Sequence, residues 1–217
     1  DDIAAVIFEP SGASWGQVPL PHGFIVALRE ATRRRGVLLI MDEVQTGLGR
    51  TGRWFGFQHG DVTPDIVTMA KALGNGVPIG ACWARDEVAT AFRTGDHAST
   101  FGGQPLAARA ALAVLDVMEA EDVPGRATAA GARLSAGLAA LPQVEQVRGL
   151  GLLIAAQLVE GIDARQVAAQ ALTQGLVVNA VTPSALRLAP SLLITDDEVD
   201  EAVAGLAHVL AAVEENP

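Results

Sequence analysis

The sequence predicts an α/β protein: a mostly parallel sheet with flanking helices, followed by a smaller α+β region. Over the first 120 residues, short apolar runs alternate with helical segments, as in βαβ units. Hydrophobic residues make up 50% of the chain but aromatic residues only 4%, which suits closely packed helices and strands. Beyond residue 120 the pattern changes, so we expect two domains, over residues 1–120 and 121–217.

Unbroken apolar runs in the first region predict strands that are buried on both faces. These runs are Ile3–Phe8, Val37–Met41, Ile66–Ala70 and Ile79–Ala84. Between the first two, a helix is expected over His22–Arg35, with Phe24 and Leu28 on one face and Gly36 at its end. The segment before that helix, from Pro10 to Pro21, is rich in Gly, Ser and Pro and predicts a loop.

Helices and short strands follow in the remaining sequence. We expect helices at Pro105–Glu119, Ala127–Leu141, Ala164–Gln174 and from Asp196 onward, with strands at Val144–Arg148, Leu152–Leu158, Leu176–Ala180 and Ala185–Leu188. Thr195 is a suitable N-cap for the last helix, and Glu198 would complete a capping box.

Charge and cysteine content exclude several classes of function. The formal net charge is −10, so nucleic acid and anionic membrane are poor partners. The single cysteine, Cys82, rules out an internal disulfide framework and a cysteine-cluster metal site; we expect no metal and a cytoplasmic setting. Because the chain opens directly on a buried strand with no signal segment, we expect that an N-terminal part of a longer protein is missing.

Three polar residues stand where predicted strands end. Glu9 follows the first strand, Asp42 the second and Lys71 the third. Ligands of open α/β sheets bind at the carboxyl ends of the strands, so the pattern predicts two acids and one lysine facing a common crevice.

Each residue also has an ordinary interpretation. An acid after a strand often just begins a turn, a lysine there is usually solvated, and the glycine-rich stretches near 74–80 and 102–103 could be plain turns. The strand ending in Asp42-Glu43 also looks like the magnesium-binding segment of a nucleotide hydrolase. That alternative requires an upstream glycine-rich loop ending in Gly-Lys-Ser or Gly-Lys-Thr, which this sequence does not contain.

Longer motifs resemble the class III aminotransferases of fold type I, most closely the acetylornithine and ornithine branch. The similar segments are Met41–Gly47, Gly49–Gly52, Thr63–Val67, Ala70–Gly74, Ser99–Pro105, Val147–Gly149, Gly151-Leu152, Asn179-Ala180 and Arg187–Pro190. The resemblance covers nearly the whole chain. It implies a pyridoxal 5'-phosphate enzyme whose first domain here is the remainder of a cofactor-binding large domain.

The resemblance also implies roles for individual residues. Lys71 would form an imine with the cofactor and move the substrate proton, and Asp42 would keep the ring nitrogen protonated. Val44 would pack on the ring and Gln45 would bind near its hydroxyl group. Thr100, with Ser99 beside it, would bind the cofactor phosphate in the partner subunit, which implies a homodimer whose site is shared across the interface.

On the substrate side, Arg187 would clamp the α-carboxylate. Glu9 matches the family glutamate after the first strand, but Ser14 stands where a second family glutamate is expected, and Trp15 would shape the pocket instead. The implied reaction moves the terminal amino group of N-acetylornithine, or of a close ω-amine, to 2-oxoglutarate in arginine biosynthesis. The alternatives are another class III ω-aminotransferase, for ornithine, succinylornithine or a 4-aminobutyrate-like donor, and a non-catalytic family member.

Overall fold

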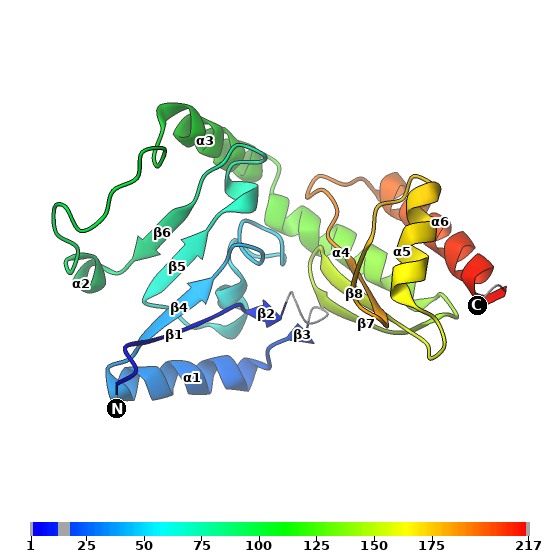
Figure 1. Ribbon diagram of the computed structural model, residues 1–217, viewed down its shortest axis with the longest axis horizontal. Coiled ribbons are helices and arrows are strands. Elements are labelled where there is room, and N and C mark those ends of the chain that lie inside the picture. The colour runs from blue at the N-terminus through cyan, green and yellow to red at the C-terminus, as the bar shows by residue number, and fades with distance from the viewer. Residues whose placement is uncertain (1, 13–17, 216–217) are drawn as a thin grey trace. The chain divides into compact units, whose positions relative to one another are not determined.

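The computed structural model describes residues 2–12 and 18–215, which form two compact units (Figure 1). The first unit comprises Asp1–Pro10, Leu20–Gly49 and Arg53–Asp122. The second unit comprises Ser11–Pro19, Arg50–Gly52 and Val123–Pro217. Two short segments from the early sequence therefore belong to the later unit. No helix within the described ranges is both long and apolar enough to span a membrane.

A four-stranded sheet forms the centre of the first unit. Its strands lie in the order β1 (Ala5–Phe8), β4 (Leu38–Asp42), β5 (Ile66–Met69) and β6 (Ala81–Ala84). β1, β4 and β5 are parallel, as expected, whereas β6 runs antiparallel to β5. The connection over residues 70–80 explains this reversal, because a parallel crossover takes about a dozen residues or more.

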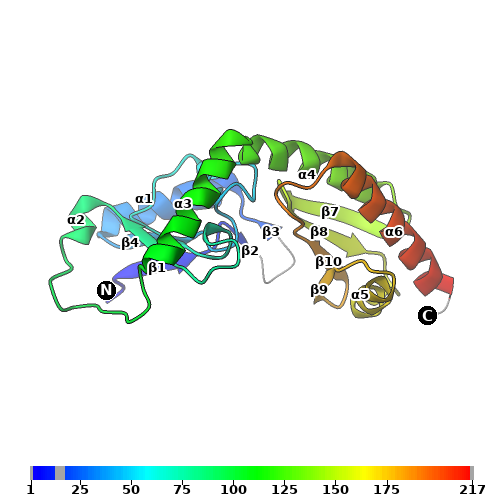
Figure 2. The ribbon, with the colours of Figure 1, turned by 90° about the horizontal axis from the view of Figure 1, so that it is seen from above.

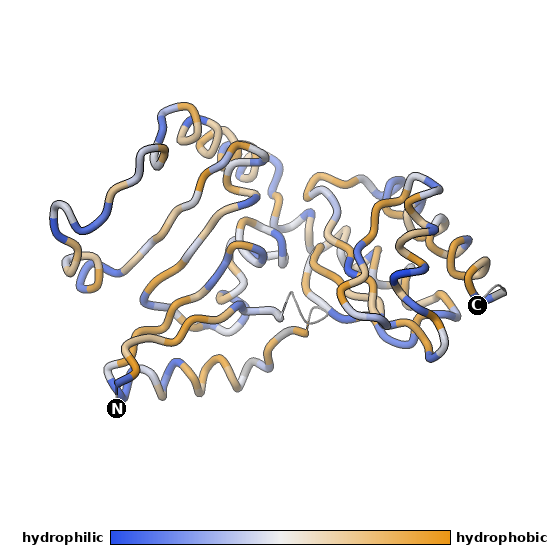
Figure 3. Tube along the Cα trace, viewed as in Figure 1, coloured by the Kyte–Doolittle hydropathy of each residue, from blue (hydrophilic) through white to orange (hydrophobic). Residues whose placement is uncertain are grey.

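Helix α1 (His22–Arg35) covers part of this sheet. Ile25 packs with Leu39 and Met41 of β4 in a buried cluster, and Figure 3 shows the apolar character of the strands. Gly36 ends the helix with φ +65°, and its N–H bonds back to the last turn, which confirms the predicted stop. The remaining elements of the unit are η2 (Gly56–Gly60), η3 (Lys71–Leu73), α2 (Asp86–Ala89) and α3 (Pro105–Ala120).

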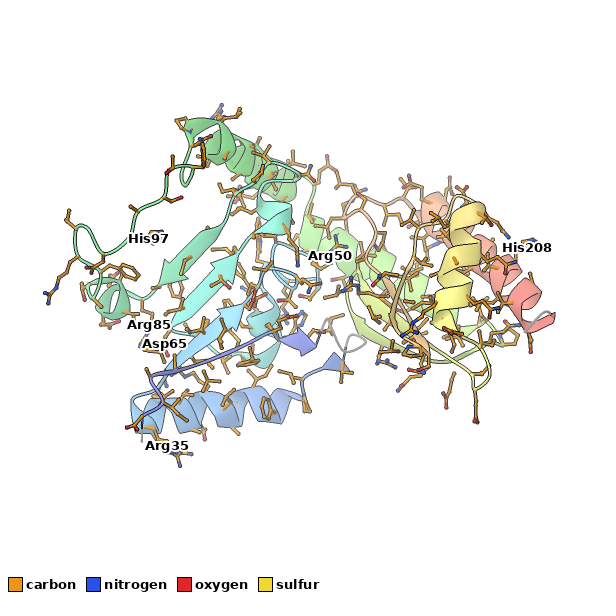
Figure 4. All side chains as sticks on the ribbon, in the orientation of Figure 1. Arg35, Arg50, Asp65, Arg85, His97 and His208 are labelled. Atoms are coloured by element: carbon orange, nitrogen blue, oxygen red, sulfur yellow. The ribbon has the colours of Figure 1, made fainter. Side chains whose placement is uncertain are left out.

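A buried carboxylate ties several elements of the first unit together. Asp65, just before β5, accepts hydrogen bonds from the Arg29 Nη1 at 2.9 Å and the Leu39 N–H at 2.7 Å. It also forms an ion pair of 2.6 Å with Arg85, and both residues are labelled in Figure 4. These partners lie on α1, near the start of β4 and just after β6. Asp65 therefore ties these elements together at the amino ends of β4 and β5, opposite their carboxyl ends.

The second unit is built on an antiparallel sheet. Its strands are β7 (Val144–Leu150), β8 (Leu153–Leu158), β10 (Ala185–Leu188) and β9 (Asn179–Thr182), in that order. Helices α4 (Val123–Ala139), α5 (Ala164–Thr173) and α6 (Asp196–Glu215) pack against it, and α4 and α6 lie side by side in Figure 2. The segment predicted as a loop contains a two-stranded ladder, β2 (Ser11–Gly12) with β3 (Val18–Pro19).

These helices and strands of the second unit bury a continuous apolar core. It includes Leu134 of α4, Ile154 of β8 and Leu206 of α6, all at most 2% exposed. The predicted capping box of α6 is present: Glu198 accepts from the Thr195 N–H at 2.8 Å, and the Thr195 hydroxyl oxygen accepts from the Glu198 N–H at 3.3 Å.

Candidate functional site

The carboxyl ends of β1, β4 and β5 bring Glu9, Asp42 and Lys71 to one edge of the first unit's sheet. Phe8 of β1 pairs with Met41 of β4 in parallel register. The residues that come next, Glu9 and Asp42, therefore lie side by side. Asp42 pairs with Thr68 of β5, three residues before Lys71. Strands lie about 4.8 Å apart, so register alone gathers the three predicted side chains at this edge.

Asp42 is the last residue of β4 and begins a tight turn. Its Oδ1 accepts the N–H of Val44 at 3.0 Å, which closes the chain around the carboxylate. The following residues, over 44–50, continue as turns, and both Val44 and Gln45 are half-buried there. The two residues expected to contact a cofactor ring are therefore held directly beside the carboxylate expected to contact its nitrogen.

Glu43 anchors this turn from below. Its side chain is 1% exposed. It accepts hydrogen bonds from the Thr46 hydroxyl at 2.5 Å, the Gly56 N–H at 2.9 Å and the Phe57 N–H at 2.8 Å. Burial raises the pKa of the Glu43 carboxyl above its ordinary value, against the lowering effect of these hydrogen bonds. With three protein donors, this carboxylate is already engaged, which weighs against the magnesium-binding alternative.

Lys71 opens the short helix η3 in a left-handed conformation. Its φ is +46°, which is uncommon for a residue with a side chain, and the side chain is exposed. The N–H groups of Leu73 and Gly74 close the turn on the carbonyls of Ala70 and Lys71 at 3.0 and 3.2 Å. Strained backbone of this kind concentrates at functional sites, so the conformation of Lys71 supports a functional rather than a merely solvated lysine.

Glu9 carries a buried side-chain oxygen that lacks a partner among the described residues. Within the described residues, its Oε2 is buried and has no hydrogen-bond partner. Buried polar atoms are nearly always paired, so an unpaired one requires an explanation. At the shared strand edge, the explanation we favour is a ligand that is polar.

Ser99 and Thr100 lie in an exposed segment before α3. The Ser99 hydroxyl oxygen accepts the Gly102 N–H at 2.9 Å, which shapes a turn around Thr100. Both residues belong to the first unit. The structure thus presents the Thr100 side chain at the surface, where a second subunit could meet it.

Arg187 lies in the second unit, in the middle of β10. It pairs with Ala155 of β8 and Asn179 of β9, and it is half-buried. Ser14 and Trp15, the other residues expected to line the substrate pocket, fall outside the described residues.

Sequence reasoning missed two charged residues near these positions, the buried Glu43 and the half-buried Arg50. The sequence pattern points to Glu43 only as a possible magnesium ligand, although an acid between an apolar strand and a turn can also anchor that turn. Arg50 was noted only as part of a motif. Its guanidinium is partly buried in the second unit, and this burial lowers its pKa to about 10, so it remains charged at neutral pH (Figure 4).

The strand-end acids and lysine on a largely parallel sheet define the class of protein. Residues 1–210 match the family described as aminotransferase class-III, and the chain belongs to that family. The predicted fold class is thereby confirmed together with the family.

Several relatives that match nearly the whole chain are acetylornithine aminotransferases. The chain is 46% identical to the acetylornithine aminotransferase of Corynebacterium efficiens over 210 residues, covering 97% of this chain and 52% of that protein. It is also 46% identical to the acetylornithine aminotransferase of Mycobacterium tuberculosis, covering 97% of this chain and 53% of that one. The chain thus spans about half the length of these relatives.

Solved structures of acetylornithine and ornithine aminotransferases are similar to this chain. The N-acetylornithine aminotransferase of Stenotrophomonas maltophilia matches with a TM-score of 0.90 and 36% identity, covering 100% of this chain and 58% of that one. An ornithine aminotransferase of Toxoplasma gondii matches with a TM-score of 0.90 and 36% identity, covering 99% of this chain and 52% of that one, and it has PLP at partial occupancy in its active site.

Proposed function

We propose that the protein is a pyridoxal-phosphate-dependent aminotransferase that transfers the terminal amino group of N-acetylornithine to 2-oxoglutarate. The observation that carries this proposal is that Asp42 ends strand β4 and Lys71 follows the neighbouring parallel strand β5, at the same edge of the sheet, in a chain of this family. The acetylornithine aminotransferases among its relatives support the donor. This reaction would place the protein in arginine biosynthesis.

The residues at the strand edge suit this cofactor. The Lys71 amine can condense with an aldehyde, and the Asp42 carboxylate can accept a hydrogen bond from a protonated pyridine nitrogen. When bound, the cofactor supplies an electron sink for the carbanion formed at the substrate carbon. Asp42 would hold a proton on the ring nitrogen, Val44 and Gln45 would orient the ring, and Lys71 would attach the cofactor and carry the substrate proton.

The second unit would contribute recognition of the substrate. Arg187 offers a planar fork of donors that matches an α-carboxylate. Glu9, Ser14 and Trp15 would line the remaining pocket. Because Ser14 replaces a glutamate expected from the family, Arg187 would lack that carboxylate as a cover, and selectivity between the two half-reactions would differ from that of typical members.

The remaining assignments follow from the same proposal. Residues 1–120 would be part of the cofactor-binding domain and 121–217 the small domain. The protein would act as a cytoplasmic homodimer, with Thr100 and Ser99 binding the cofactor phosphate of the partner subunit. Exposure of Phe101, at 77%, supports an interface beside Thr100.

A second donor class has support of its own. The similarity to ornithine aminotransferases, at 36% identity, favours ornithine as the alternative amino donor. Succinylornithine and 4-aminobutyrate-like donors belong in the same comparison, because all present a primary amine on a chain that ends in a carboxylate.

Testing this proposal requires the protein expressed from its complete reading frame, loaded with pyridoxal 5'-phosphate. We expect a visible absorbance band that Lys71→Ala removes together with transamination, and a donor panel led by N-acetylornithine. Lys71→Arg keeps the charge but cannot attach the aldehyde, so it controls for the charge alone. A band that persists in Lys71→Ala would show that another lysine holds the cofactor. A protein without band or turnover would be a non-catalytic member of the family.

A further inference from the structure

Arg50 belongs to a short segment that is inserted into the second unit. The segment Arg50–Gly52 lies against the turn between β7 and β8. A Cβ on Gly151 would come within 2.5 Å of the Thr51 carbonyl carbon and 2.7 Å of the Arg50 carbonyl oxygen. Because Gly151 also has φ +54°, only glycine fits there, and the two backbones meet without space between them.

Arg50 and Leu152 exchange hydrogen bonds across this contact. The Leu152 N–H donates to the Arg50 carbonyl at 3.0 Å, and the Arg50 Nη1 donates to the Leu152 carbonyl at 3.2 Å. The same Nη1 donates to the carbonyl of Pro190 at 2.7 Å. One guanidinium nitrogen therefore joins the residue before β8 to a residue just after β10.

These two carbonyls lie at the same end of the β8–β10 ladder. Leu188 pairs with Ile154, so the antiparallel register, continued by two residues, places Pro190 opposite Leu152. Arg50 thus closes the ladder just beyond its last strand pair. Arg187, the residue before Leu188, forms the neighbouring strand pair with Ala155.

Arg50 loses more of its hydration than a fully exposed surface arginine does, and this loss is unfavourable for its charge. Burial disfavours its charged form, as the lowered pKa of about 10 reflects, yet the two acceptors of its Nη1 are neutral carbonyls. A charged donor improves such bonds, and they hold the end of β10 in place. Substrate-binding side chains must be held to a fraction of an ångström, which requires this kind of support.

We propose that Arg50 is the positioning residue that sets the place of Arg187, and through it the affinity for the substrate α-carboxylate. This inference rests on the proposed function, in which Arg187 binds that carboxylate. Arg50 itself would touch neither substrate nor cofactor. Its loss would let the end of β10 shift, and a displacement of about 1 Å at a binding group can cost about a hundredfold.

The test uses the cofactor-loaded protein from its complete reading frame and glutarate, a dicarboxylate with no amine or carbonyl to react. Calorimetry would give the glutarate dissociation constant. We expect Arg50→Met to weaken glutarate binding by about ten- to a hundredfold, and Arg50→Lys, which keeps the charge and one donor group, to recover part of that loss. The visible absorbance of the bound cofactor should stay unchanged.

Two variants separate the possible causes. Arg126→Met removes another arginine of the second unit, one that donates to the Leu193 carbonyl at 3.4 Å, and should leave glutarate binding as it is. Arg187→Gln removes the proposed clamp and should weaken binding at least as much as Arg50→Met. Kinetics with pentylamine, which has no carboxylate, should show little change in KM for either Arg50 variant.

The outcomes distinguish this inference from the proposed function. Weak glutarate binding in Arg187→Gln but not in Arg50→Met or Arg50→Lys would overturn the role of Arg50 and leave the aminotransferase assignment intact. Unchanged binding in Arg187→Gln would overturn both the carboxylate clamp and the role of Arg50. Equal losses of affinity for glutarate and pentylamine in the Arg50 variants would show a general structural role and would also overturn the inference.

Discussion

The two units differ in how completely they bury their apolar side chains. In the second unit, α4, α5, α6 and the sheet enclose a large continuous core. In the first unit, the sheet carries α1, while Ile7 of β1 is 60% exposed and Leu106 of α3 is 76% exposed. Exposed apolar side chains of this size are typical of interfaces. The second unit therefore encloses a larger apolar core by itself than the first unit, which bears Asp42 and Lys71.

The largest expected effect concerns the cores themselves. Leu134 of the second unit and Leu39 of the first are both at most 2% exposed. Leu134→Ala should cost about 2–5 kcal/mol of stability, because the surrounding core cannot collapse into the cavity. Leu39→Ala should cost less, since its cluster is smaller. Hydrogen exchange of β8 and β4 amides would measure each loss in its own unit.

Equal losses of stability in Leu134→Ala and Leu39→Ala would contradict the difference between the two units. They would mean that contacts of the first unit with other protein complete its core as fully as α4 to α6 complete that of the second. Leu172→Ala in α5 supplies the control, because a leucine that is 63% exposed should change stability by less than about 0.5 kcal/mol.

The second effect tests whether Asp42 acts on the cofactor or on the substrate. Asp42→Asn would replace a charge-assisted hydrogen bond to the ring nitrogen, worth about 1.5–3 kcal/mol, by a neutral one. Turnover should therefore fall by roughly 10- to 150-fold. Because Asp42 would act on the cofactor and not on the substrate carboxylate, kcat should fall alike for N-acetylornithine and pentylamine in steady-state assays.

Asp61→Asn is the control for this substitution. Asp61 lies at the end of η2 with φ +51°, a conformation that asparagine also tolerates. It should keep full activity. A selective loss with N-acetylornithine in Asp42→Asn would instead place Asp42 at the substrate rather than at the cofactor ring.

Much of this arrangement could be predicted from sequence, for identifiable reasons. Apolar runs gave the strands, and Gly36 and the pair Thr195 and Glu198 gave helix ends, because those signals are local. Asp42 and Lys71 can be singled out because each follows an apolar run, and the parallel register brings those strand ends together; their roles stay predictions.

The features that escaped prediction depend on contacts distant in sequence. Arg50 bonds to Leu152 and Pro190, and Glu43 bonds to Gly56 and Phe57, and no periodicity reports either set. Strand β6 was expected in a parallel sheet, but its direction depends on the length of the connection before it. The roles of Ser14 and Trp15 remain predictions.

The third effect tests Glu43, which holds the turn over residues 44–50 of the first unit in place. In Glu43→Gln, one amide N–H₂ must face either the Gly56 or the Phe57 N–H, so a buried donor loses its acceptor. The cost should be about 1–3 kcal/mol. Denaturant unfolding would measure it, and weaker retention of the cofactor would show that the turn carrying Val44 and Gln45 has loosened.

The pH dependence of this cost has a definite sign. Burial raises the pKa of Glu43 in the folded protein, so the folded state holds a proton that the unfolded state has already lost. The stability contributed by this carboxyl is therefore full below the unfolded pKa and falls as pH rises through the folded one. The stability difference between wild type and Glu43→Gln should shrink from about pH 4 upward; a growing difference would contradict the raised pKa.

The smallest effect comes from the second unit and has the opposite sign of pH dependence. Glu198 of the α6 capping box is exposed, and hydrogen bonds from the Thr195 backbone and then its side chain lower the pKa of that carboxyl. Stability from this group is present above the unfolded pKa and is lost as pH falls through the folded one. Thr195→Ala should cost about 1 kcal/mol through loss of the cap and raise the pKa of Glu198 part of the way, as NMR titration would show. Thr195→Ser keeps the hydroxyl and should change neither. Because the backbone bond persists in both variants, a Glu198 pKa fully restored to its ordinary value in Thr195→Ala would mean that the whole first turn of α6 unwinds without its cap.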